Sequence, residues 1–157
     1  MTAVGIRFLA DVPGHADALA GWHHAQWRHL YQGWTLEHAR GELRDHATRR
    51  ARPTTLVALD GDTLLGSVSL VDEDAPELRD QGDAWLASLY VVPEARGTGL
   101  GKQLVQALVA FAAGQGVERL WLFTPDHADY YARLGWRPQG HASLHGTRVH
   151  LMDILPA

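Results

Sequence analysis

Apolar residues recur at helical spacing in four segments of the chain. After Thr35, a favourable N-cap residue, they fall at every third or fourth position while the opposite face of the segment is charged. Gly33 and Gly135 each follow such a segment at a point where helices commonly end. The spacing predicts helices over residues 15–30, 35–47, 99–113 and 127–134.

Segments rich in β-branched and aromatic residues lie around these helices. Residues 54–59 and 63–71 flank Asp60-Gly61-Asp62, a turn signal that predicts an antiparallel hairpin. Further strands are predicted over residues 6–10, 85–92, 120–124, 136–141 and 147–155. The resulting order, β, α, α, β, β, β, α, β, α, β, β, predicts an α/β fold in which helices flank a mixed, mostly antiparallel sheet, with no regular βαβ alternation.

Residues 72–83 interrupt the apolar pattern with a strongly acidic segment. They contain six Asp or Glu residues against a single arginine, Arg79, together with Pro76 and Gly82. Such a composition predicts an exposed loop.

Composition and charge exclude several classes of protein. The 157 residues, 46% apolar and 20% charged, suit one globular domain over residues 1–157. No apolar run approaches the roughly 18 residues of a membrane span, and the net charge of −4 disfavours a nucleic-acid partner. The absence of cysteine excludes disulfides, thiolate metal sites and thiol catalysis. The first ten residues are too polar for a signal peptide, so a cytoplasmic location is expected.

Residues 89–103 combine the end of a predicted strand, a loop with three glycines and the start of a helix. The amides from Gly97 to Lys102 would precede the helical hydrogen bonds, and glycine lets a phosphate approach such a backbone closely. A Walker loop would need Gly at position 96 and Ser or Thr at 103, where Arg96 and Gln103 stand. A dinucleotide fingerprint would need a third glycine at 102 or 104, where lysine and leucine stand. The segment therefore predicts a pyrophosphate site of another kind.

The pattern Arg96-x-x-Gly99-x-Gly101, directly after Val92-Pro93, resembles the acyl-CoA loop of the GNAT acetyltransferase family. Residues 130–136, a Tyr-Tyr pair followed by Leu-Gly-Trp, resemble the C-terminal signature of that family. The resemblance covers nearly the whole chain and implies the acyl-CoA N-acyltransferase (GNAT-like) fold, with acetyl-CoA as acetyl donor. The coenzyme-binding residues that it implies are Tyr90, Val91, Val92, Arg96, Gly97, Thr98, Gly99, Leu100, Gly101 and Lys102.

The resemblance also implies roles in acetyl transfer. Tyr131 stands four residues before Gly135, where the family carries the acid that protonates the departing thiolate; a core aromatic residue is the alternative. A main-chain amide at Tyr90 to Val92 would polarise the acetyl carbonyl, because the family bulges this strand. The family often places a glutamate base on the same strand, but residues 85–89 contain no acid. The remaining candidates for the base, besides a water relay, are Asp83, Glu73, His23 and His24.

Aromatic and acidic residues together indicate the nature of the acceptor. In the family, the first two helices and the loop before the coenzyme strand wall the acceptor site, and here these segments are rich in Trp and acids. Aromatic faces and negative charge suit a small cationic amine, although tryptophans that fill the core would give the same pattern. The predicted acceptor-binding residues are Trp27, Tyr31 and Trp85.

The expected function is transfer of an acetyl group from acetyl-CoA directly to a primary amine of a small cationic molecule. Two alternatives stay open: a protein acetyltransferase acting on an N-terminus or a lysine, and a non-catalytic module that binds acyl-CoA. No metal is expected, because the ten histidines include no His-Glu-x-x-His motif and His23 and His24 point to different faces of a helix. The sequence leaves open whether the chain forms a homodimer.

Overall fold

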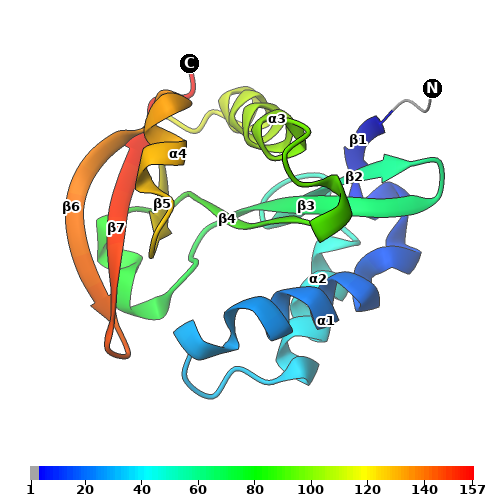
Figure 1. The fold of residues 1–157 in the computed structure, drawn as a ribbon, viewed down its shortest axis with the longest axis horizontal. Coiled ribbons are helices and arrows are strands. Elements are labelled where there is room, and N and C mark those ends of the chain that lie inside the picture. Colours follow the sequence, from blue (N-terminus) through cyan, green and yellow to red (C-terminus); the bar gives the residue numbers. More distant parts are fainter. Residues whose placement is uncertain (1–3) are drawn as a thin grey trace.

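A seven-stranded sheet runs through the centre of the protein, with helices on both of its faces (Figure 1). The architecture is that of a computed structural model, which describes residues 4–157. The strands are β1 (Val4–Phe8), β2 (Thr54–Asp60), β3 (Thr63–Val71), β4 (Trp85–Val91), β5 (Leu120–Thr124), β6 (Arg137–Leu144) and β7 (Thr147–Ile154). The helices are α1 (Ala16–Trp27), α2 (Leu36–His46), α3 (Leu100–Gly114) and α4 (Ala128–Arg133).

The strands lie in the order β1-β2-β3-β4-β5-β7-β6. Every neighbouring pair is antiparallel except β4 and β5, which are parallel. The predicted α/β fold with a mixed, mostly antiparallel sheet is therefore confirmed, as is the hairpin of β2 and β3.

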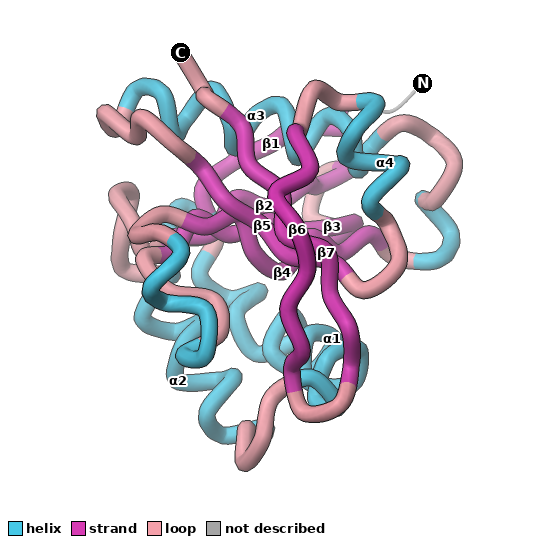
Figure 2. Tube along the Cα trace, turned by 90° about the vertical axis from the view of Figure 1, so that its left-hand side faces the viewer, coloured by secondary structure: helices cyan, strands magenta, loops and turns pink. Residues whose placement is uncertain are grey.

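Two apolar layers hold the sheet from opposite sides. Along β2, Leu56 and Ala58 pack into the cluster that contains the apolar face of α3, whereas Val57 packs with Leu19 of α1 and Leu43 of α2. This alternation follows from the two-residue period of a strand. Figures 1 and 2 show α1 and α2 on one face of the sheet and α3 on the other. Each fully buried leucine stabilises the fold by about 1.5–3 kcal/mol.

Helix α2 begins with a capping box in which histidine takes the usual place of glutamate. The Thr35 hydroxyl accepts from the His38 N–H at 3.1 Å, and His38 Nδ1 accepts from the Thr35 N–H at 3.3 Å. Both donors would otherwise be unpaired at the helix start. The predicted start of this helix is confirmed.

Some predicted boundaries differ from the observed ones. The helix predicted over residues 15–30 ends at Trp27 and continues as a 3-10 turn, Arg28–Leu30. The strand predicted over residues 6–10 lies at Val4–Phe8, and a 3-10 turn, Leu9–Asp11, follows it. Within residues 4–157, no helix has the length and apolar content needed to cross a membrane.

The acidic segment over residues 72–83 is not the wholly exposed loop that its composition predicts. It contains a 3-10 turn, Pro76–Gln81, and its two apolar residues are buried, Ala75 at 1% and Leu78 at 6% exposure. Both pack with Trp85 and Trp121. This apolar anchor fixes the acids of the segment against the body of the protein, close to the end of β3.

Candidate active site

The parallel strands β4 and β5 separate almost as soon as they meet. Among the described residues they pair at Trp85 and Trp121 alone. Further along β4, the pairing register with β3 shifts, and Ser88 adopts a φ of 57°, which is uncommon for a residue other than glycine. The resemblance implied a bulge in this strand, and the structure places one around Ser88, two residues before the main-chain segment from Tyr90 to Val92 that was expected to polarise the carbonyl.

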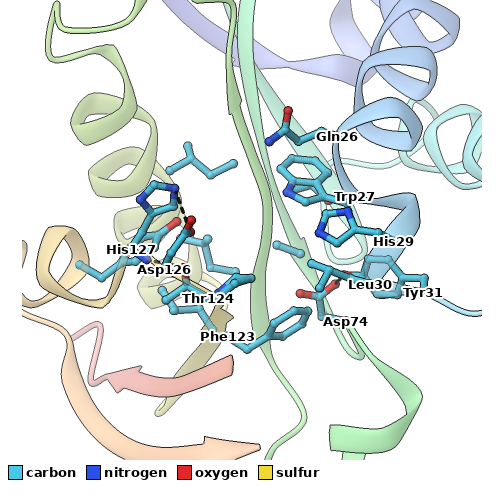
Figure 3. A pocket seen from close by; sticks show the side chains of 17 residues that line it. Gln26, Trp27, His29, Leu30, Tyr31, Asp74, Phe123, Thr124, Asp126 and His127 are labelled. Carbon is cyan, nitrogen blue, oxygen red and sulfur yellow. Dashed lines mark hydrogen bonds and ion pairs between the residues drawn. The ribbon is translucent and has the colours of Figure 1, made fainter. Parts of the chain in front are cut away.

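A cavity of about 230 Å³ opens where the two strands separate (Figure 3). Residues 86–89 of β4 and 122–124 of β5 line it from the sheet. Trp27 and Tyr31 reach it from the end of α1, and Tyr131 reaches it from α4. We refer to this space as the central cavity.

The segment over residues 96–102, here called the glycine loop, joins β4 to α3. Gly97 and Gly99 have φ values of 77° and 84°, a left-handed conformation that strains residues carrying a Cβ. The Gln103 N–H bonds to the Gly99 carbonyl at 3.1 Å, so the amides of residues 100–102 precede the helical pattern and are available as donors. The dipole of the 15-residue helix adds partial positive charge at the same point. This arrangement is typical of a phosphate site.

Side chains around the glycine loop leave room for a ligand and add charge. Arg96 and Lys102 are exposed, and Arg96 Nε donates to the Val91 carbonyl at 2.9 Å. A Cβ at Gly101 would stand 2.8 Å from Tyr130 Oη, so any other residue would displace the Tyr130 side chain or the helix start where α3 passes α4. Leu100 is buried with 4% exposure, so it can meet a ligand through its amide only. The implied coenzyme-binding residues thus form one continuous stretch from β4 into α3.

Tyr131 is held rigidly beneath the central cavity. Its ring meets Tyr130 and Trp136 edge to face, with centroid distances of 5.3 and 6.1 Å. The Trp136 N–H returns to the Tyr131 carbonyl at 3.1 Å, and the intervening Gly135 has a φ of 96°. Burial, helped by Tyr130 and Asp74, raises the pKa of Tyr131 well above its usual value. The phenol therefore stays protonated and can donate a proton into the cavity.

A second cavity of about 410 Å³ adjoins the central one. Trp27, Tyr31, Asp74 and Ser88 line both spaces. We call the second space the acidic cavity, and its charged and aromatic side the acidic wall. The acidic wall consists of Trp27, Tyr31, Trp34, Glu42, Glu73, Asp74 and Glu77.

Trp27 and Tyr31 lie where an acceptor would be expected, but Trp85 does not. The Trp85 side chain is fully buried, its Nε1 donates to the Gly82 carbonyl at 3.0 Å, and its ring lies 6.1 Å from that of Trp121. A Cβ at Gly82 would meet the Trp121 ring at 2.3 Å, which shows how closely the segment is packed. The prediction of Trp85 as an acceptor-binding residue does not fit the structure, because the ring packs beneath the acidic segment and not against the cavity.

The four candidate bases occupy very different surroundings. His23 is buried, its Nε2 lies 2.9 Å from Ser67 Oγ, and burial together with His46 lowers its pKa to about 3, so it is neutral and weakly basic. His24 pairs through Nε2 with the Trp34 carbonyl at 3.0 Å. Asp83 lines neither the central cavity nor the acidic cavity. Glu73 alone of the four stands on the acidic wall.

Asp74 was not among the candidate bases that the sequence suggested. Tyr31 Oη donates to Asp74 Oδ1 at 2.8 Å. Burial raises the pKa of Asp74 to about 7, with Glu42 adding to the effect and the Tyr31 hydrogen bond opposing it. In sequence, this acid is one of six acidic residues spread over residues 72–83. Its environment depends on contacts with residues more than 30 positions away, which no local pattern shows.

The described residues contain no cluster of three or more His, Cys, Asp or Glu side chains that could hold a metal ion.

The chain matches a family model, described as Acetyltransferase (GNAT) family, over residues 17–136. No curated protein matches it. Among solved structures, a GNAT-family protein from Desulfovibrio desulfuricans is 19% identical, with 99% of this chain and 100% of that chain covered and a TM-score of 0.74. At such identity the likeness shows the fold.

Two further structures share the fold. An aminoglycoside 6'-N-acetyltransferase complexed with coenzyme A is 16% identical, with 99% of this chain and 97% of that chain covered and a TM-score of 0.72. A chimeric spermidine N-acetyltransferase with sequence from Vibrio cholerae is 17% identical, with coverages of 98% and 95% and a TM-score of 0.67.

The split sheet and the glycine loop define an acyl-CoA N-acyltransferase fold. The chain belongs to the GNAT acetyltransferase family. The glycines of the loop leave its backbone open and the amides of residues 100–102 are free to donate, so this segment can hold a phosphate group.

Proposed function

We propose that this protein is an acetyl-CoA-dependent N-acetyltransferase that transfers the acetyl group directly to a primary amine of a small cationic molecule. The observation that carries the proposal is that the central and acidic cavities share Trp27, Tyr31, Asp74 and Ser88. A thioester held between β4 and β5 would thus meet an amine bound at the acidic wall without leaving the cleft.

On the donor side, the main chain does most of the binding. The N–H groups of the glycine loop hold the pyrophosphate, with Arg96 and Lys102 adding charge. Bound acetyl-CoA supplies the activated acetyl group and a thiolate as leaving group. The main chain of β4, exposed where the strand is bulged, polarises the carbonyl, and Tyr131 protonates the departing sulfur. The phenol is protonated at neutral pH, as this role requires, and because burial makes it a weaker acid its proton moves only as negative charge develops on the sulfur.

On the acceptor side, charge and shape favour a small cation. Glu42, Glu73 and Glu77 border the acidic cavity together with the rings of Trp27 and Trp34. Negative charge attracts an ammonium group, and aromatic faces bind it in cation–π contacts. The cavity volume of about 410 Å³ falls within the range of about 300–1,000 Å³ typical of small-molecule sites. Structures of this fold include enzymes named for aminoglycosides and for spermidine, which are amines of this kind.

The proposal is tested with a panel of acceptors at fixed acetyl-CoA. The panel contains spermidine, kanamycin, free lysine and a short peptide with one lysine and a free N-terminus, and the readout is release of free thiol above the rate without acceptor. We expect the small polycations to react with a higher kcat/KM than the peptide. Preference for the peptide would favour a protein acetyltransferase. Binding of acetyl-CoA with no thiol release for any amine would favour a non-catalytic module.

A further inference from the structure

The carboxylate of Asp74 reaches the cleft from outside β4, at the point where its cavities meet. Asp74 follows β3 and precedes the 3-10 turn Pro76–Gln81, whose buried apolar residues anchor the segment. It lines the central cavity, the acidic cavity and a third cavity of about 260 Å³, and Ser88 is the other residue common to all three. Asp74 therefore stands where β4 is bulged and begins to separate from β5. Figure 3 shows it beside Tyr31, across the cavity from Thr124 and His127.

The orientation of this carboxylate is fixed by Tyr31. Tyr31 Oη donates to Asp74 Oδ1, and the Tyr31 ring is held by Trp34 and Phe123, with centroid distances of 5.2 and 6.4 Å. Among residues 4–157, the second oxygen, Oδ2, has no hydrogen-bond partner. One oxygen is thus used for positioning, and the other is available to a ligand in the cleft.

Asp74 and Tyr131 act on the same space from opposite sides. Both line the central cavity, and the charge of Asp74 is one of the causes that raise the pKa of Tyr131. The pKa of about 7 for Asp74 suits a group that must accept and release protons near neutral pH. Strand β4, where the family often carries a base, has no acid over residues 85–89.

We propose that Asp74 is the general base that deprotonates the amine acceptor, and that Tyr31 is its positioning residue. This inference rests on the proposed function. The acceptor enters as an ammonium ion and gives one proton to Asp74 Oδ2. The free amine attacks the acetyl carbonyl carbon, a C–N bond forms and the C–S bond breaks. Tyr131 gives its proton to the sulfur and regains one from the new amide nitrogen. Asp74 then releases its proton to solvent, so one proton is released in each turnover.

Other ionisable groups face Asp74 from the elements around the cleft, and any pH profile includes them. Glu42 of α2 and Tyr31 act on it most directly. The remaining groups that line the central or acidic cavity are His29, His38, Glu73, Glu77, Asp126, His127 and Tyr131.

The first test compares Asp74→Asn with the wild type over a range of pH, using spermidine and kanamycin as probes. We expect kcat to fall about 100-fold near neutral pH. The deficit should shrink as the pH rises toward the pKa of the amine, about 10, because the acceptor then deprotonates without a base. Asp80→Asn is the matched control, because Asp80 is exposed in the same segment and lines none of the three cavities; its profile should match the wild type. A deficit independent of pH would mean that Asp74 is structural and would overturn the proposal.

The second test shifts the pKa of Asp74 without removing its carboxylate. Tyr31→Phe removes the hydrogen bond that lowers the pKa of Asp74, so the ascending limb of kcat/KM should move to higher pH. Glu42→Gln removes a negative charge that raises this pKa, so the limb should move to lower pH, and the hydrogen bond from Trp34 Nε1 can be kept by the glutamine oxygen. Shifts in the same direction, or no shift in either variant, would contradict the assignment.

A third readout does not depend on activity. Carbon-13 NMR of the unliganded protein should show one carboxyl that titrates near pH 7 and disappears in Asp74→Asn. Acetyl-CoA affinity by calorimetry should be unchanged in that variant. If the wild type acetylates spermidine or kanamycin while Asp74→Asn is equally active, this proposal fails and the proposed function stands. If the wild type acetylates no amine of the panel, both fail.

Discussion

The glycine loop and the acidic wall supply binding groups in different ways. Residues 96–102 are consecutive and offer main-chain N–H groups at the start of α3, so a ligand meets the same donors whatever side chains stand there. The acidic wall takes Trp27 from α1, Glu42 from α2 and Asp74 from the segment after β3, and it acts through side chains. Substitution should therefore disturb the loop where a Cβ intrudes, where a positive φ requires glycine or where Arg96 or Lys102 loses its charge, whereas each change in the wall alters acceptor affinity or chemistry.

The largest expected effect is on the free energy of unfolding, and it distinguishes the buried Trp85 from Trp27 of the acidic wall. Trp85→Ala should lower the free energy of unfolding by about 3–5 kcal/mol, because it leaves a cavity beside Trp121. Trp27→Ala, the same substitution at a partly exposed position, should cost roughly 1 kcal/mol or less and should instead raise the KM of the amine. Urea unfolding and steady-state kinetics measure both. Equal loss of stability in the two variants would show that Trp27 is also a core residue.

The next effect concerns Tyr131 and the acetyl transfer that joins the coenzyme at the glycine loop to the amine at the acidic wall. Tyr131→Phe should lower kcat by about 10- to 1000-fold, because the thiolate then leaves without a proton donor. The ring packing against Tyr130 and Trp136 is retained, so acetyl-CoA affinity by calorimetry should stay near that of the wild type. Unchanged turnover would make Tyr131 a packing residue.

A smaller effect is expected in the glycine loop. Gly101→Ala should weaken acetyl-CoA binding on the order of tenfold, because the new Cβ would stand 2.8 Å from Tyr130 Oη and displace the helix start. Gly114→Ala, at the other end of the same helix, meets nothing within 4 Å and should bind normally.

Adding Tyr130→Phe to Gly101→Ala identifies the cause. The hydroxyl is removed, and the next Tyr130 atom lies 3.8 Å from the Cβ, so affinity should recover if the clash is responsible. No recovery would mean that the Cβ blocks the phosphate itself. Normal affinity in Gly101→Ala alone would contradict the role of the loop.

The smallest effect tests the charge of the wall without its proposed base. The double variant Glu73→Gln with Glu77→Gln should raise the KM of a cationic amine roughly threefold at low ionic strength, and added salt should remove the difference. The KM of acetyl-CoA should not change. An unaltered amine KM at low salt would show that these charges do not act on the acceptor.

The glycine loop is continuous in sequence and the acidic wall is assembled from distant segments, and this difference explains what the sequence could predict. The glycine loop is one uninterrupted segment with fixed spacing, so the pattern from Arg96 to Gly101 predicts both its place and its ligand class. The order of helices and strands along the chain follows from hydrophobic periodicity in the same way. Local patterns are sufficient wherever the partners of a residue lie within a few positions of it.

The acidic wall could be predicted only in part. Trp27 and Tyr31 are found, but Trp85 has the same aromatic character and is fully buried. Asp74 looks like its acidic neighbours in sequence, and its distinction comes from Tyr31, 43 positions away, and from burial. The position of the bulge at Ser88 depends on how β3 and β4 pair, and composition does not record it. These properties arise from tertiary contacts between distant segments.

The most direct test of the account is transfer of a labelled acetyl group. The wild type is incubated with spermidine and acetyl-CoA deuterated in the acetyl methyl group, and the amine is analysed by mass spectrometry and NMR. The account predicts that the intact deuterated acetyl group appears on a nitrogen of the amine, one for each free thiol released. Stabilisation of the protein by acetyl-CoA without any labelled amine, for spermidine and for the rest of the panel, would contradict it.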